Sequence, residues 1–141
     1  MSVPTWKRNE SVAEYVWQIR QLNIDIAEII SNKPKKYKST HSDLLVKTAL
    51  EALANANMAN DIYVQDDKDY DTRRRLLIKA KGQLNNIALL SDIFLELCKK
   101  SPNCDRVKCV KDQYRIGDRC KHCINLINGV LKSDKKRYKS K

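Results

Sequence analysis

The sequence predicts an all-α protein, folded as an up-down-up-down antiparallel four-helix bundle. Apolar residues recur every three or four positions in four stretches of the chain, which is the spacing of one helical face. Short polar connections separate these stretches, and short connections favour antiparallel neighbours. No stretch alternates apolar and polar residues as a half-buried strand does, and we detect no internal repeat.

The 141 residues fit a single domain. Because 42% of them are hydrophobic and only three are glycine and three proline, the chain can bury a core. No apolar run is long enough to span a bilayer, so we expect no segment to cross a membrane. The N-terminus lacks the apolar segment of a signal peptide, and we expect a cytoplasmic protein with reduced cysteines.

The first elements are an N-terminal arm over residues 1–10 and a helix over residues 11–31, the first helix of a bundle that covers residues 11–131. Ser11 and Glu14 have the spacing of a capping box at the start of this helix. We expect the helix to end before Pro34, because proline disfavours helix at the preceding residue.

The second helix, over residues 42–64, is the element on which we expect the others to pack. Its large apolar residues lie near its beginning, at Leu44, Leu45, Val46 and Leu50. Alanine and asparagine alternate in its second half, and an alanine face lets a neighbouring helix approach closely. The asparagine amides either form hydrogen bonds between helices or subunits or are solvated on the outer face. Candidates for close helix packing or subunit contact are Ala52, Asn55, Ala56, Ala59 and Asn60.

The third and fourth helices are expected over residues 69–99 and 105–131, followed by a basic tail over residues 132–141. Gly117 and Gly129 weaken or bend the fourth helix. Its predicted inward face comprises Val110, Tyr114, Ile116, Cys120, Cys123, Ile124, Ile127 and Leu131.

Positive charge dominates the chain, because 28 Lys and Arg face 17 Asp and Glu, for a formal charge of +11. This favours nucleic acid as a partner first and an anionic membrane surface second. In the predicted topology, one end of the bundle collects Lys7, Arg8, Lys68, Arg73, Arg74, Arg75, Lys132, Lys135, Lys136, Arg137, Lys139 and Lys141. A secondary basic set at the opposite end comprises Lys33, Lys35, Lys36, Lys38, Lys99, Lys100, Arg106 and Lys108.

The triplet Arg73–Arg75 lies near a helix N-terminus, where the macrodipole disfavours positive charge. Either these arginines bind a ligand, or Asp69 pairs with Arg73 and Asp71 with Arg75 one helical turn away. Arg74 lacks such an acidic neighbour.

Tyr37 and Tyr138 each lie within a basic run, where a tyrosine either stacks on a base or simply packs against the protein.

Five cysteines lie close together in the sequence, at Cys98, Cys104, Cys109, Cys120 and Cys123. Cys120 and Cys123 have zinc-ligand spacing, with His122 between them. A continuous helix, however, separates Cys109 from Cys120 by about 16 Å along its axis, too far for one tetrahedral site. Cys120 and Cys123 also suit the inward face as small hydrophobic residues. We therefore expect no metal, and a disulfide formed on oxidation would join two of Cys98, Cys104 and Cys109.

No catalytic constellation is present in the sequence. The two histidines, His41 and His122, fit surface positions, and neither a glycine-rich phosphate loop nor the Glu-x-x-His pair of a di-iron bundle occurs. We predict no enzymatic activity and no cofactor.

Three segments resemble the accessory variability (Avd) proteins of diversity-generating retroelements, which belong to a larger bacterial four-helix-bundle family. The segments are Val3-Pro4-Thr5-Trp6-Lys7-Arg8, Asn57-Met58-Ala59-Asn60 with Tyr63, and Lys132-Ser133-Asp134-Lys135-Lys136-Arg137-Tyr138. The resemblance implies a homopentameric barrel that binds a reverse transcriptase and its template RNA and supports mutagenic cDNA synthesis. It implies nucleic-acid or polymerase contacts at Lys7, Arg8, Arg73, Arg74, Arg75, Lys132, Lys135, Lys136 and Arg137. The five cysteines and Gly117 depart from the family pattern.

Two other functions remain open. The first is a stand-alone protein that binds structured RNA, like the ribosomal-RNA intervening-sequence proteins of the same larger family. The second is a metal- or redox-responsive module that uses Cys98, Cys104 and Cys109.

Overall fold

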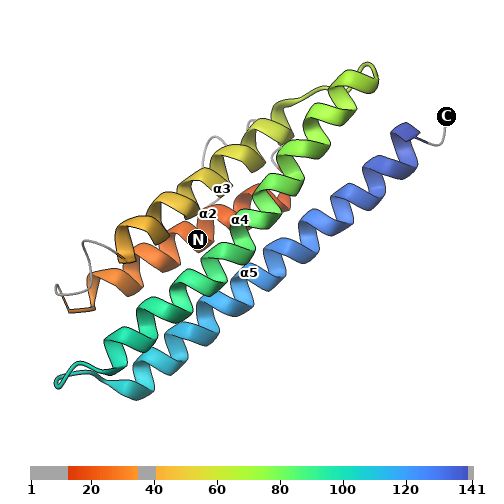
Figure 1. Cartoon of the computed structure of the whole chain (residues 1–141). Coiled ribbons are helices and arrows are strands. Elements are labelled where there is room, and N and C mark those ends of the chain that lie inside the picture. Colours follow the sequence, from red (N-terminus) through yellow and green to blue (C-terminus); the bar gives the residue numbers. More distant parts are fainter. Residues whose placement is uncertain (1–12, 35–40, 140–141) are drawn as a thin grey trace, which may run out of the picture.

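A computed structural model of the chain describes residues 13–34 and 41–139 (Figure 1). Within these residues it contains four α-helices and no strand, which confirms the all-α, four-helix prediction. The helices are α2 (Glu14–Ser31), α3 (Asp43–Asp61), α4 (Asp67–Lys99) and α5 (Arg106–Asp134), and α5 continues into the π-helix η3 (Lys135–Lys139). The predicted arm, Ser11 and the basic residues Lys7, Arg8, Lys35, Lys36, Lys38 and Lys141 lie outside the described residues, as does Tyr37.

Each helix packs against two others, so that the four surround one core. α2 and α4 each contact both α3 and α5. Figure 1 shows the long helices α4 and α5 side by side, joined by a short turn. The core is built from apolar side chains of all four helices, among them Ile19, Leu22, Leu45, Leu84, Phe94 and Ile127.

The alanines of α3 form the buried face of that helix. Ala49, Ala52, Ala56 and Ala59 recur at intervals of three and four residues and are fully buried. Such small side chains let α2 approach, and the Asn23 amide of α2 donates a hydrogen bond of 3.0 Å to the carbonyl oxygen of Ala49. The alanine face therefore serves helix packing within the chain.

Most of the large apolar residues of α3 point away from this face. Leu45 is buried, whereas Leu44 is 49% and Leu50 54% exposed. The reason is the phase of the helix, because Leu45 shares its face with the alanines and Leu44 and Leu50 do not.

The predicted inward face of α5 is wrong at its beginning. Val110 is 39% and Tyr114 69% exposed, and Cys109 and Asp112 occupy the buried positions instead. An unpaired buried carboxylate is strongly unfavourable, but Asp112 is paired with Lys33 of the segment after α2. α5 runs without interruption through Gly117 and Gly129.

Candidate nucleic-acid interface

One end of the bundle is held by Arg73, and we call it the arginine end. Arg73 Nε donates to Asp134 Oδ2 at 2.6 Å, and Arg73 Nη1 donates to the Ala59 carbonyl oxygen at 3.0 Å. These bonds tie the beginning of α4 to the last turns of α3 and α5. Burial acts to lower the pKa of Arg73, but the hydrogen bond and the charge of Asp134 outweigh it and raise that pKa.

The pair of Asp69 with Arg73, which was one of the two alternatives for the arginine triplet, does not form. The Asp69 carboxylate instead accepts from the Gln65 backbone N–H at 3.1 Å, and its own N–H donates to the Asp66 side chain that caps α4. Arg73 thus links three helices. Its partner Asp134 is distant in the sequence, and the packing of the helices brings the two side chains together.

Seven other cations of this end are exposed. The Arg73–Asp134 pair brings the beginning of α4 beside the end of α5, so the two groups of cations lie at the same end of the bundle. The exposed cations are Lys68, Arg74, Arg75, Lys132, Lys135, Lys136 and Arg137. Asp134, the acidic residue within the run 132–138, is buried and paired, so the exposed charge of that run is wholly positive.

Tyr138 packs against the protein at this end. Its ring centroid lies 5.9 Å from that of Tyr70 with an interplanar angle of 53°, a favourable tilted arrangement. The Arg137 guanidinium lies 5.9 Å from the same ring. This geometry favours packing over base stacking for Tyr138, and it anchors η3 to α4.

Tyr15 of α2 is buried near the arginine end. Its hydroxyl has no hydrogen-bond partner among the described residues. Burial raises its pKa to about 12, although the positive charge of Arg73 acts in the opposite direction.

In the middle of the bundle, a buried carboxylate joins α2 to α5. Asp25 accepts from Arg115 Nη2 at 2.7 Å and from Arg119 Nε at 3.0 Å. Arg115 also donates to Glu28 at 2.9 Å. These two arginines are therefore engaged within the fold, and the sequence pattern did not identify them.

The asparagines of α3 differ in their surroundings. The Asn55 amide donates to Gln83 Oε1 of α4 at 2.8 Å, which is a hydrogen bond between helices. Asn57 is exposed and Asn60 half-buried. Asn55 thus fits the prediction of a hydrogen bond between helices, and Asn57 fits the prediction of a solvated outer face.

The opposite end of the bundle is held by a second buried pair, and we call it the thiol end. Lys33 Nζ lies 2.5 Å from Asp112 Oδ2, with both side chains less than a tenth exposed. Lys33 is therefore engaged within the fold and is not exposed like other cations of this end. Cys104 and Cys109 lie nearby with their Sγ atoms 3.3 Å apart, and all five cysteines are reduced. Lys99 is bound to Glu96 at 3.2 Å, whereas Lys100, Arg106 and Lys108 are exposed.

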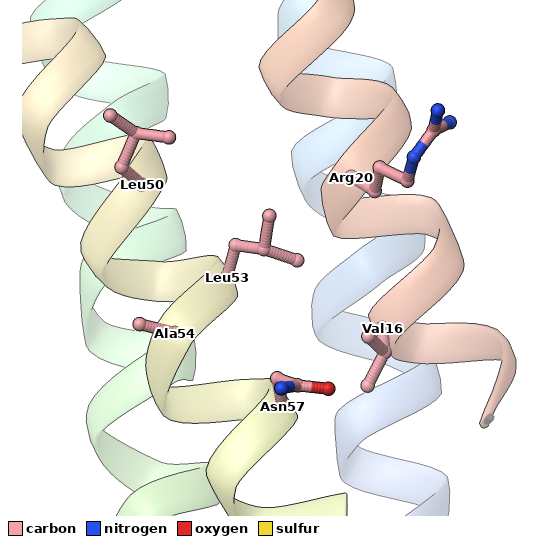
Figure 2. Close-up of a pocket in the computed structure, with 6 residues that line it drawn as sticks. All are labelled: Val16, Arg20, Leu50, Leu53, Ala54 and Asn57. Atoms are coloured by element: carbon pink, nitrogen blue, oxygen red, sulfur yellow. The ribbon is translucent and has the colours of Figure 1, made fainter. Parts of the chain in front are cut away.

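An apolar groove lies between α2 and α3 (Figure 2). It has a volume of about 340 Å³, and Figure 2 shows Leu53 of α3 pointing across it toward Val16 and Arg20 of α2. A second hollow next to it shares Leu50 and Ala54. Together they form an apolar hollow on this face, and none of the predicted site residues lines it.

Within the described residues, His, Cys, Asp and Glu side chains form no group of three or more that could hold a metal ion. The described helices also include none long and apolar enough to cross a membrane.

These features define a basic four-helix protein with a cluster of exposed cations at one end. The chain matches no family model, and no curated protein and no solved structure matches it.

Proposed function

We propose that the chain binds nucleic-acid phosphates through the arginine end, as a non-catalytic accessory protein of a reverse transcriptase and its template RNA. The observation that carries the phosphate-binding part is the exposed positive run over residues 132–138, placed beside Arg74 and Arg75 by the Arg73–Asp134 pair. Cations that neutralise phosphates release condensed counterions, which supplies affinity without base specificity.

The cations proposed for binding are separate from the cation that holds the helices together. Arg73 spends its donors on Asp134 and on a backbone carbonyl, so a bound phosphate does not have to disrupt this packing. Aspartates 66, 67, 69 and 71 lie at the start of α4 and reduce the local charge there. The surface of α5 and η3 is consequently the stronger part of the interface.

The polymerase partner and the assembly rest on the resemblance to the accessory variability proteins, and we also propose a cytoplasmic location. We extend the proposal to an up-down-up-down order of helices and to a homopentameric barrel. The apolar groove of α2 and α3 and the hollow next to it, lined by Val46, Leu50 and Leu53, support self-association, because contiguous exposed apolar surface marks contact sites.

RNA binding is tested with a matched pair of charge-reduced variants. The first carries Lys132→Gln, Lys135→Gln, Lys136→Gln and Arg137→Gln. The control removes four exposed lysines from elsewhere, through Lys100→Gln, Lys108→Gln, Lys111→Gln and Lys121→Gln. Fluorescence anisotropy of a labelled single-stranded RNA is measured over a salt series, with thermal unfolding as a check on folding.

We expect the first variant to bind about a hundredfold more weakly and to lose roughly 3 units of the slope of log K against log salt. The control should change little, although its net charge is the same. Equal losses in both variants would show that net charge, rather than the arginine end, governs binding and would refute the proposed interface.

The polymerase partner is tested by a pull-down of the tagged chain from its native host after nuclease treatment. A retained reverse transcriptase would support the accessory role. Retention of a structured RNA in an untreated parallel sample, with no polymerase, would instead support the stand-alone RNA-binding function.

A further inference from the structure

The turn between α4 and α5 places two thiols in contact. Asp105 caps α5, with its side chain accepting from the Lys108 backbone N–H at 3.0 Å. Cys104 directly precedes the cap and Cys109 is the fourth residue after it, which are the two positions that commonly form an apolar staple at a helix start. Here the staple consists of two sulfur atoms 3.3 Å apart.

The pair is accessible from solvent on one side. Cys104 is half-buried and Cys109 buried, and both line an open cleft of about 500 Å³ with Lys33, Asn103 and Cys98. A small disulfide or peroxide therefore meets Cys104 first, and Cys109 lies directly behind it.

Charged and titratable groups of three elements surround Cys109. Burial and the hydrogen bond with Cys104 raise the pKa of the Cys109 thiol to about 11, while the ammonium of Lys33 acts to lower it. Asp112 neutralises part of the Lys33 charge. Cys98 of α4 also acts to raise the pKa of Cys109. Cys109 is consequently protonated at neutral pH, which suits a resolving thiol better than an attacking one.

We propose that Cys104 and Cys109 form a redox-active dithiol that a low-molecular-weight disulfide of the glutathione class converts reversibly to an intramolecular disulfide. The Cys104 thiolate attacks one sulfur of the small disulfide, whose S–S bond breaks, and one thiolate leaves and takes up a proton. Cys109 then loses its proton to water and attacks the Cys104 sulfur, and the second small thiol leaves. Two protein thiols and one small disulfide become one protein disulfide and two small thiols.

The same helix contains a control pair. Cys120 and Cys123 have the spacing of a redox motif, but both are buried in the core, and burial raises the pKa of each to about 12. Neither reaches the cleft. Sequence spacing alone would select this pair, whereas contact and access select Cys104 and Cys109.

The test uses the full, reduced chain in buffers with a series of ratios of reduced to oxidised glutathione near pH 8. Each sample is quenched with acid, alkylated and digested with trypsin. Because trypsin cleaves after Lys100, Arg106 and Lys108, the cysteines 98, 104 and 109 fall on three different peptides, and those at 120 and 123 on two more. A cross-linked pair therefore identifies its own partners by mass.

We expect the peptides 101–106 and 109–111 to appear linked, with a mass two hydrogens lower than their sum, and to separate again on reduction. The thiols of Cys120 and Cys123 should stay reduced and become alkylated only after unfolding. In the Cys104→Ser variant we expect no intramolecular disulfide, since the accessible thiol is lost.

Several results would overturn the proposal. One is a persistent glutathione adduct on Cys104 with Cys109 still reduced, and another is a link from Cys104 or Cys109 to Cys98. Linkage of Cys120 with Cys123 under conditions that leave the turn reduced would do the same.

Discussion

The two ends of the bundle are each secured by one buried pair of opposite charges, yet they are built differently. At the arginine end, Arg73 has two partners, Asp134 and the Ala59 carbonyl, and exposed cations surround it. At the thiol end, Lys33 is paired with Asp112, and thiols lie beside it. The comparison shows that a cation can belong to the fold or to the surface, and that sequence alone does not separate the two.

The largest effect is expected from removing the carboxylate at either end. Asp112→Ala should lower the free energy of unfolding by about 3–5 kcal/mol, because it leaves the Lys33 charge buried without a partner. Asp134→Ala should lower it by about 1–3 kcal/mol, because Arg73 keeps its bond to the Ala59 carbonyl. Urea denaturation of both variants measures the difference, and a larger loss for Asp134→Ala would contradict this comparison.

Alkaline pH should increase the difference in stability between the two ends, since lysine can lose its proton there and arginine cannot. Burial acts to lower the pKa of Lys33, but Asp112 and Cys109 outweigh it and raise that pKa above 10.5. The stability from this pair is therefore complete below pH 10.5 and is lost as the pH rises through the raised value.

The thiol end should weaken first on alkalisation. The Cys109 contribution is also lost as the pH rises from 9.0 to about 11, whereas the contribution of Tyr15 near the arginine end is lost later, as the pH rises from 10.0 to about 12. Hydrogen exchange between pH 9 and 11, corrected for intrinsic rates, should show opening at the α4–α5 turn before the end of α5. The reverse order would show that the Lys33 pair does not control that end.

The smallest effect is expected at Tyr138. Tyr138→Leu removes the contact with the Tyr70 ring and should lower the free energy of unfolding by about 1 kcal/mol. Because the ring packs against the protein, the salt dependence of RNA binding should not change. If the variant loses more RNA affinity than its lower stability explains, the base-stacking interpretation would be restored.

The fold class follows from the sequence because helix formation and amphipathic patterning are local. The periodic apolar residues predicted four helices, and the described residues contain them. The run 132–138 was likewise identified as basic from its residues alone, since four of its side chains are Lys or Arg.

Only the tertiary structure decided which polar residues are buried and which cations are exposed. Lys33 with Asp112, Arg73 with Asp134 and Arg115 with Asp25 join residues 79, 61 and 90 positions apart. A charged side chain enters the interior when a partner offsets its loss of hydration, and nothing near it in the sequence reports that partner. The same dependence on a distant partner explains why the predicted inward face of α5 was wrong at its beginning. Asp112 is buried there because it is paired with Lys33, whereas Val110 and Tyr114 are exposed.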